Sequence, residues 1–156
     1  MKVLISDNLH EAGIALLESH PNIEVVNRPG MKPEELKEVI KDVDALVIRS
    51  ATKVTEDLIN AAPRLKVVGR AGTGLDNVDI PAASKRGIVV MNTPGGNTIT
   101  TAEHAVSLML AMARNIPQAS QSMRENKWEK KKFQGTEIYN KTLGVIGLGR
   151  IGSVVA

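Results

Sequence analysis

Three glycines near the end of the chain have the spacing of a site for the pyrophosphate of a dinucleotide. Gly147, Gly149 and Gly152 follow an apolar run, residues 143–146, that is typical of a buried parallel strand. In such a site the first glycine permits a tight turn, the second lets the backbone approach the pyrophosphate, and the third lets a helix pack closely on its strand. The start of that helix would present free N–H groups to the phosphates. The glycine motif alone is weak evidence, and the acidic residue expected about 20 positions further on would lie past Ala156.

A second set of residues has the chemistry of an anion site. Arg49 follows the apolar run 45–48, Arg70 follows 66–69, and a glycine-rich stretch, 92–97, follows 88–91. Ligands of open parallel sheets bind outside the carboxyl ends of the strands, and a guanidinium group binds carboxylate or phosphate through two hydrogen bonds. The sequence therefore predicts a small-anion site formed by both arginines and this loop. The alternative is that each arginine is a surface residue or one half of a structural ion pair.

Strand and helix patterns alternate in the first 91 residues. The expected strands are 3–5, 23–26, 45–48, 66–69 and 88–91, and helical patterns separate them. This alternation is typical of a parallel sheet with helices on both faces, the α/β class. Asn8, Thr55 and Asp79 are the expected N-caps of helices, and Pro33 is expected in a first helical turn.

The pattern changes after residue 97. Thr100 and Glu103 have the spacing of a capping box, and a long helix is expected up to Pro117, followed by a second helix over 117–125. Glu103 and the adjacent His104 could suggest a general base, but a role in the cap and a place on the helix face are the favoured interpretations.

All three aromatic residues lie in one segment after these helices: Trp128, Phe133 and Tyr139. Aromatic side chains are enriched at the cores of protein interfaces. We therefore expect Trp128 and Phe133 to be buried against a partner subunit.

Composition and charge exclude several classes of protein. The chain has no cysteine, which excludes disulfides and thiolate metal sites. No apolar run approaches the roughly 20 residues of a membrane-spanning helix, and the N-terminus turns polar too early for a signal peptide, so a cytoplasmic protein is expected. The net charge is only +3, and the segment 124–141 holds six basic and three acidic residues, which accounts for that excess. This is not the charge distribution of a nucleic-acid-binding protein.

Five runs of sequence resemble the D-isomer-specific 2-hydroxyacid dehydrogenases. They are Arg-Ser-Ala-Thr-Lys-Val-Thr (49–55), Val-Gly-Arg-Ala-Gly-Thr-Gly-Leu-Asp-Asn-Val-Asp (68–79), Met-Asn-Thr-Pro-Gly-Gly-Asn (91–97), Trp-Glu-Lys-Lys-Lys-Phe-Gln-Gly-Thr-Glu (128–137) and Lys-Thr-Leu-Gly-Val-Ile-Gly-Leu-Gly-Arg-Ile-Gly (141–152). The resemblance covers the whole chain. It implies that residues 1–97 are a flavodoxin-like substrate-binding domain. Residues 98–156 would then be a dimerisation helix, a connecting segment and the first βα unit of a Rossmann NAD-binding domain, truncated at Ala156.

The resemblance also implies an activity and site residues. The complete protein would oxidise 3-phosphoglycerate to 3-phosphohydroxypyruvate with NAD, the first step of L-serine biosynthesis. It would form a homodimer or a higher homo-oligomer through helix 100–116 and the segment of Trp128 and Phe133. The implied substrate-binding residues are Arg49, Ser50, Arg70, Ala71, Gly72 and Asn97. The implied NAD-binding residues are Thr73, Gly147, Gly149, Arg150, Ile151 and Gly152.

The catalytic residues of the family are expected beyond residue 156, so this chain alone is expected to be an inactive fragment. Three alternatives remain open. The complete protein could act on another 2-hydroxyacid, as a hydroxypyruvate or glyoxylate reductase does, although Arg49 and Lys53 favour a doubly anionic substrate. It could be an NAD-sensing, corepressor-like binding protein. The chain itself could be a dimerising truncated product.

Overall fold

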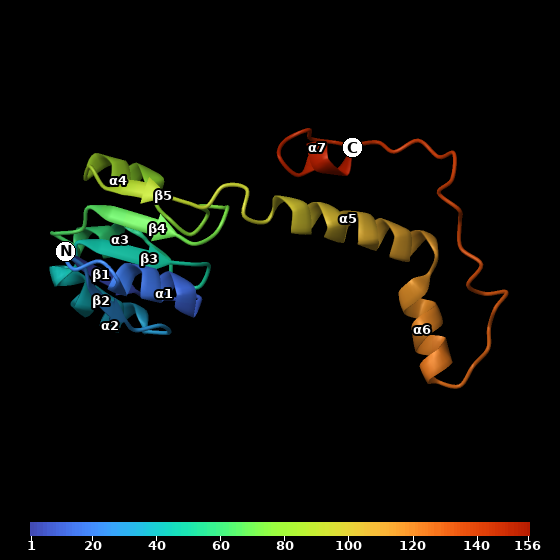
Figure 1. The fold of residues 1–156 in the computed structure, drawn as a ribbon, viewed down its shortest axis with the longest axis horizontal. Helices are drawn as coiled ribbons and strands as arrows, with labels where there is room; N and C mark the ends of the chain where they lie inside the picture. Colours follow the sequence, from blue (N-terminus) through green and yellow to red (C-terminus); the bar gives the residue numbers. More distant parts are fainter. The chain divides into compact units, whose positions relative to one another are not determined.

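The computed structural model describes residues 1–156 and divides into two compact units, Met1–Gly96 and Asn97–Ala156 (Figure 1). The first unit contains five parallel strands in the order β2-β1-β3-β4-β5. The strands are β1 (Lys2–Ile5), β2 (Glu24–Asn27), β3 (Ala45–Ile48), β4 (Val67–Arg70) and β5 (Val89–Met91). This is the flavodoxin-like strand order, so the predicted α/β class is confirmed.

The helices of the first unit alternate with these strands. They are α1 (Glu11–Glu18), α2 (Pro33–Val39) with the short 3-10 helix η1 (Ile40–Asp42), α3 (Glu56–Asn60) and α4 (Ile80–Lys85). Because crossovers between parallel strands are right-handed, the step from β1 outward to β2 places α1 on one face, and the steps from β2 to β5 place the other helices on the opposite face.

The main apolar core lies on the face covered by α2, α3 and α4. Leu4, Leu46 and Val68 are aligned across three neighbouring strands and fully buried, and Leu36 and Ile59 pack against them from the helices. By contrast, α1 contributes no buried residue. The hydrophobic stabilisation of this unit therefore comes largely from one face of the sheet.

The helix caps test the sequence predictions one by one. Thr55 accepts a hydrogen bond from the Leu58 amide and Asp79 accepts one from the Ala82 amide, as predicted. Pro33 is the first residue of α2, also as predicted. The Asn8 prediction is wrong, because α1 begins two residues later than it requires, and the His10 ring nitrogen accepts the Ala12 amide instead.

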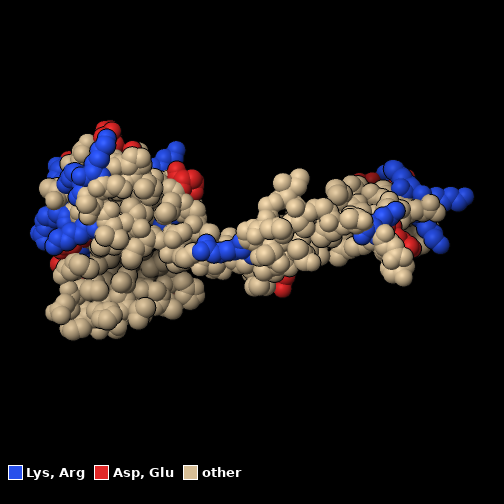
Figure 2. Space-filling model, turned by 90° about the horizontal axis from the view of Figure 1, so that it is seen from above, with Lys and Arg blue, Asp and Glu red and all other residues tan.

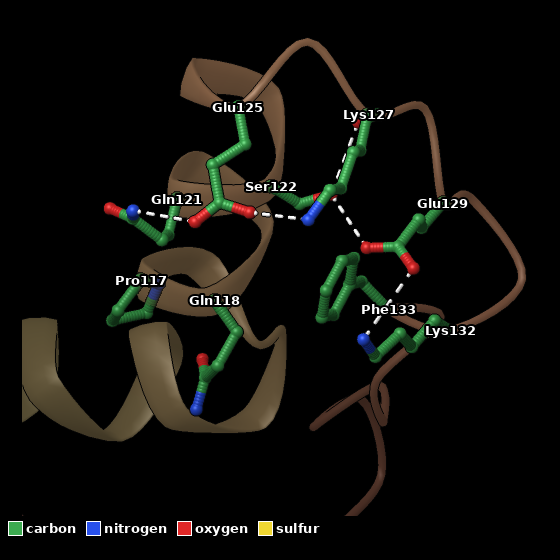
Figure 3. A pocket seen from close by; sticks show the side chains of 9 residues that line it. All are labelled: Pro117, Gln118, Gln121, Ser122, Glu125, Lys127, Glu129, Lys132 and Phe133. Carbon is green, nitrogen blue, oxygen red and sulfur yellow. Dashed lines mark hydrogen bonds and ion pairs between the residues drawn. The ribbon is translucent and has the colours of Figure 1, made fainter.

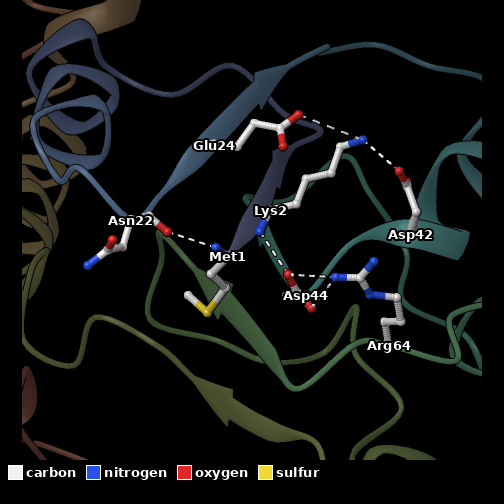
Figure 4. A network of polar contacts seen from close by, with 7 residues as sticks. All are labelled: Met1, Lys2, Asn22, Glu24, Asp42, Asp44 and Arg64. Carbon is white, nitrogen blue, oxygen red and sulfur yellow. Dashed lines mark hydrogen bonds and ion pairs between the residues drawn. The ribbon is translucent and has the colours of Figure 1, made fainter.

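A polar network closes the N-terminal edge of the sheet (Figure 4). The buried Asp44 accepts the Lys2 amide at 2.8 Å and lies 3.1 Å from the guanidinium of Arg64, while the Lys2 ammonium donates to Asp42 at 2.6 Å. The hydrogen bond from the Lys2 amide, followed by the contact with Arg64, outweighs desolvation and lowers the pKa of Asp44. This network is at the edge opposite to the carboxyl ends of the strands, so we assign it to folding and not to ligand binding.

The second unit contains α5 (Thr98–Ala113), α6 (Ile116–Arg124) and α7 (Gly152–Val155). The capping-box prediction is wrong: α5 begins at Thr98 with Asn97 as its N-cap, and Thr100 donates its hydroxyl back to the Asn97 carbonyl at 3.1 Å. His104 is exposed on this helix, as expected for a residue of the helix face. Glu103 is exposed as well.

The apolar run 143–146 forms no strand in this structure, so that prediction is wrong for the chain as described. A parallel strand needs a neighbour to pair its backbone N–H and C=O groups, and no other segment pairs with this run. Ile146 is accordingly fully exposed. A helix that spans a membrane would have to be longer and more apolar than any helix found here.

Candidate functional site

The candidate site of the first unit lies at the carboxyl edge of the sheet, between the ends of β1 and β3. These neighbouring strands lead into crossovers that run in opposite directions, to β2 and to β4. Such a point leaves a crevice in which open α/β sheets bind their ligands. Asp7 follows β1 at this point, and Arg49 follows β3.

Asp7 fixes the loop that follows β3. The residue is 6 % exposed, and its carboxylate accepts the Arg49 amide at 2.6 Å, the Thr52 amide at 3.1 Å and the Thr52 hydroxyl at 2.7 Å. Burial raises the pKa of this carboxyl, but the hydrogen bonds from Thr52 and from the Arg49 amide outweigh it, so that the pKa lies below its usual range. Asp7 is therefore ionised at neutral pH and acts as an anchor for the loop.

Asn77 holds the same loop from the other direction. Its side-chain amide donates to the carbonyl of Arg49 at 2.8 Å and to that of Thr52 at 2.6 Å. An isolated parallel bridge between Val54 and Val78 continues the contact. The Asp7 carboxylate thus accepts hydrogen bonds from N–H groups of residues 49–52, and the Asn77 amide donates to their C=O groups. Together they fix the backbone conformation of this loop. Neither Asp7 nor Asn77 was predicted as a site residue.

The two arginines lie at this edge, as predicted, and both bind other groups of the protein. The Arg70 side chain crosses the end of β3, because its Nε donates to the Arg49 carbonyl at 3.3 Å, while its Nη1 lies 2.9 Å from the Asp76 carboxylate. Arg49 donates from Nη1 to the Asn8 carbonyl at 3.2 Å. Arg70 thus forms a structural ion pair, which is the alternative that the sequence left open. However, the Asp76 side chain is 84 % exposed, which leaves the pair weak and open to competition from another anion.

Two glycines after β4 leave room for the Arg70 side chain. A Cβ atom at Gly74 would lie 2.9 Å from Arg70 Nη1, and one at Gly72 would lie 3.4 Å from Arg70 Nε. The amides of Ala71 and Gly72 donate to the carbonyls of Ile48 and Arg70. The loop 70–74 therefore wraps around the guanidinium of its own first residue.

The loop after β5 joins the same edge. The Asn92 side chain donates to the Thr73 carbonyl at 2.7 Å, and the Thr93 amide donates to the Gly72 carbonyl at 3.0 Å. The structure thus brings together the ends of β3, β4 and β5, as the sequence predicted. Ser50 is exposed in the loop that Asp7 fixes. Asn97 belongs to the second unit, as the N-cap of α5, so its predicted place in the substrate site stays a prediction.

In the second unit the glycine motif forms a tight turn. Gly147 has a φ of +95°, which only glycine adopts readily. A Cβ atom at Gly152 would lie 1.9 Å from the Gly147 carbonyl oxygen and 3.5 Å from a methyl group of Val145, whereas one at Gly149 would meet nothing within 4 Å. The turn thus requires glycine at its first and third positions, and it leaves the second position open. Arg150 is exposed and Ile151 is the N-cap of α7.

A hollow of about 530 Å³ lies beside α6 and the segment 127–133 (Figure 3). Its charged groups bind one another: Glu125 accepts from Gln121 and Lys127, and the Glu129 carboxylate accepts from the buried Ser122 and lies 3.5 Å from Lys132. We infer no ligand site there, because each carboxylate is already paired.

The aromatic residues differ in exposure within this unit. Phe133 is half-buried at the hollow with the Lys132 ammonium 5.4 Å from its ring centre, whereas Trp128 is 78 % exposed. On the face of the second unit that Figure 2 shows, charged side chains are sparse along the middle of the unit. Leu108 and Met112 of α5 are exposed.

Groups for acid–base or metal chemistry are scarce. None of the three histidines, His10, His20 and His104, forms a hydrogen bond or an ion pair with a carboxylate. No cluster of histidine, aspartate and glutamate could hold a metal ion. What the geometry does bring together is two cationic side chains, Arg49 and Arg70, at the carboxyl edge of the sheet.

The chain is similar to several known proteins. Residues 3–144 match the model of the catalytic domain of D-isomer specific 2-hydroxyacid dehydrogenases. Over 99 % of its length the chain is 52 % identical to D-3-phosphoglycerate dehydrogenase of Synechocystis sp. and 53 % identical to that of Homo sapiens. It covers 28 % and 29 % of those proteins, so it spans less than a third of their length. Among solved structures, the NAD⁺-bound 3-phosphoglycerate dehydrogenase of Entamoeba histolytica superimposes with a TM-score of 0.76 at 35 % identity, over 99 % of this chain and 49 % of the other.

Proposed function

Because this chain belongs to the family of D-isomer specific 2-hydroxyacid dehydrogenases, we propose that it is part of a cytoplasmic enzyme that oxidises 3-phosphoglycerate to 3-phosphohydroxypyruvate with NAD, the first step of L-serine biosynthesis. The observation that carries the proposal is the meeting of Arg49 and Arg70 at the carboxyl edge of the sheet, joined by the hydrogen bond from Arg70 to the Arg49 carbonyl. A substrate with a carboxylate and a phosphate needs two such cations.

We assign substrate binding to residues 1–97 and the beginning of the NAD-binding domain to residues 98–156. In the first, the anion would displace Asp76 from Arg70 and bind beside Arg49 and the exposed Ser50. The backbone of Ala71 and Gly72 would complete the site, and Asn97 is assigned to substrate binding on the resemblance of its motif. The Asp7 carboxylate and the Asn77 amide would keep the Arg49 backbone in place during this exchange.

The glycine turn of the second unit fits a dinucleotide. Gly147 and Gly152 close the turn, Gly149 leaves the space in which a pyrophosphate could approach, and Arg150 and Ile151 are adjacent to it. Thr73 is assigned to the nicotinamide end on the resemblance of its motif. NAD, when bound, accepts the hydride of the substrate. The residues of this chain would bind and orient the two ligands.

The test is a titration of the chain with 3-phosphoglycerate, followed by amide NMR. We expect shifts at Arg49, Ser50, Arg70, Ala71 and Gly72. Replacement of Arg70 by Ala should weaken binding at least about tenfold, since a charge-assisted hydrogen bond contributes about 1.5–3 kcal/mol. Arg124→Ala removes the same charge from an exposed position on α6 and serves as the control. Equal binding by both variants would contradict the proposal.

The same titration with D-glycerate separates the alternatives within the family. A site built for a phosphorylated substrate should bind glycerate much more weakly, because one of the two anionic groups is missing. Equal affinity would favour a hydroxypyruvate or glyoxylate reductase. The non-enzymatic alternative, an NAD-sensing corepressor-like protein, would be excluded by turnover of the complete protein.

We expect the purified chain to produce no NADH from 3-phosphoglycerate and NAD. Removal of the hydride leaves a hydroxyl proton that a positioned base must take, and no histidine–carboxylate pair occurs in the described residues. The measurement is absorbance at the NADH band over hours at high protein concentration. Sustained formation of NADH above a protein-free blank would overturn this expectation.

We further propose that the protein forms a homodimer or a higher homo-oligomer through residues 100–116 and the segment of Trp128 and Phe133. The exposed Leu108, Met112 and Trp128 support this proposal, since an apolar surface of this kind is unusual on a monomer. Replacing Trp128 and Phe133 together by Ala should shift the mass measured by light scattering to that of a monomer. Tyr139→Ala, at a comparably exposed aromatic residue, should leave the mass unchanged.

A further inference from the structure

A cavity of the first unit, about 340 Å³ in volume, lies beside the proposed anion site. It lies between α2, α3 and the loop after β3, and neither Arg49 nor Arg70 lines it. Its apolar wall includes Met31, Leu36 and Leu58, of which the two leucines belong to the buried core. This volume is within the range of cavities that bind small organic molecules.

The polar side of the cavity offers one free charge. Lys53 lines the cavity and forms no ion pair or hydrogen bond. The Lys37 ammonium, by contrast, lies 4.0 Å from Glu34 and 3.9 Å from Asp57, so its charge is shared with two carboxylates. The Asp7 carboxylate also lines the cavity, but backbone amides and a hydroxyl already occupy its oxygens. An anion in the cavity could therefore bind Lys53, whereas no unpaired carboxylate on the wall is available to bind a cation.

We propose that this cavity is a separate binding site for a small aliphatic carboxylate, with the hydrocarbon chain against Met31, Leu36 and Leu58 and the carboxylate at Lys53. A pure hydrocarbon would leave the ammonium unused, and a short polar anion such as acetate would leave the apolar wall in contact with water. The combination of one cation with an apolar wall selects a molecule that has both parts.

A ligand in the cavity would change the environment of the Arg49 backbone. Thr52 lines the cavity, and its amide and hydroxyl bind the same Asp7 carboxylate that accepts the Arg49 amide. A ligand that packs against Thr52 and Lys53 therefore acts on the hydrogen bonds that hold the Arg49 backbone. Binding at this cavity would therefore affect the proposed substrate site through Asp7 and the Arg49 backbone, although the ligand would not contact Arg70.

The test is a titration of the chain with hexanoate, followed by amide NMR in the absence of any substrate. We expect shifts at Met31, Leu36, Thr52 and Lys53, together with Arg49, and little change in β5. Hexanol and acetate, tested separately, should each bind at least about fivefold more weakly, because each lacks one of the two parts.

Two variants that each remove one lysine charge test whether hexanoate binding depends on Lys53 in particular. Lys53→Met keeps the length of the side chain and should weaken hexanoate binding about tenfold, the equivalent of one charge-assisted hydrogen bond. Lys85→Met, at an exposed position on α4 that does not line the cavity, should bind hexanoate like the unmodified chain. The proposal is overturned if hexanoate shifts none of the cavity residues, or if both variants bind it equally. It is also overturned if the shifts follow Arg70 instead of the cavity wall. Because no substrate is present, none of these results depends on the proposed dehydrogenase function.

Discussion

Replacement of Asp7 by Ala is expected to lower the free energy of unfolding of the chain by about 2–4 kcal/mol, because it leaves two partly buried amides without an acceptor. These are the amides of Arg49 and Thr52, which the Asp7 carboxylate accepts at 2.6 Å and 3.1 Å. The loop after β3 would lose the group that fixes it, so Arg49 should also bind an anion more weakly. The first measurement is urea unfolding at pH 7.

The effect of Asp7 should depend on pH in a defined direction. Its pKa is lower in the folded chain than in the unfolded chain, so its ionised form stabilises the fold above about pH 4, the pKa of an unperturbed aspartate. That contribution is lost as the pH falls through the lowered pKa. The difference between the unmodified chain and Asp7→Asn should therefore be largest near neutral pH and should shrink below about pH 4.

Asp57→Asn is the matched control for this experiment. Asp57 has an 81 % exposed side chain and only a 3.9 Å contact with Lys37. It should change the unfolding midpoint little at any pH, as is usual for an exposed ion pair. If Asp7→Ala is as mild as this control, the assignment of Asp7 as the anchor of the loop is wrong.

Gly152→Ala is expected to disturb the turn itself, whereas Gly149→Ala is expected to disturb only the binding of a ligand to it. A Cβ atom at position 152 would lie 1.9 Å from the backbone oxygen of Gly147, so the turn must open even without a ligand. A Cβ atom at position 149 meets nothing within 4 Å, so the ligand-free turn should persist. That methyl group would instead occupy the space where the backbone must approach a pyrophosphate.

Amide NMR distinguishes the two variants. Gly152→Ala should move the signals of residues 147–155 in the chain without ligand, whereas Gly149→Ala should move only those next to it. In the complete protein both should weaken NAD binding by at least about a hundredfold, the order of effect expected when a pyrophosphate loses its backbone contacts. Unchanged NAD binding by Gly149→Ala would contradict the role assigned to this turn.

The sheet and its arginines were predictable because they depend on local patterns. Strands of apolar residues, separated by helices with Thr55 and Asp79 as caps, fix the order of elements. Parallel geometry then brings Arg49 and Arg70 to one edge. The ion pair between Arg70 and Asp76 was not predictable, because Asp76 carries no signal in the sequence that separates it from any other loop carboxylate.

Asp7 and Asn77 were missed because their role is long-range. Each binds a loop that is 25 to 45 residues away in the sequence, and nothing in their immediate neighbours indicates the partner. One signal was available: Asp7 is a carboxylate two residues after the end of a buried strand, at the edge where two crossovers diverge. The run 143–146 shows the opposite error, since its apolar pattern is that of a strand but the strand has no neighbour with which to pair.

Helix α1, which contributes no buried residue, has a consequence for the motions of the first unit. Segments with few buried contacts open at low free energy, whereas core strands open only when the whole domain unfolds. The amide hydrogens of α1 should therefore exchange with solvent water long before those of β1, β3 and β4, whose residues Leu4, Leu46 and Val68 are fully buried. The sheet and the helices of its better-packed face should behave as one slow unit, and α1 should open and close on it while the anion site at the ends of β3 and β4 stays intact.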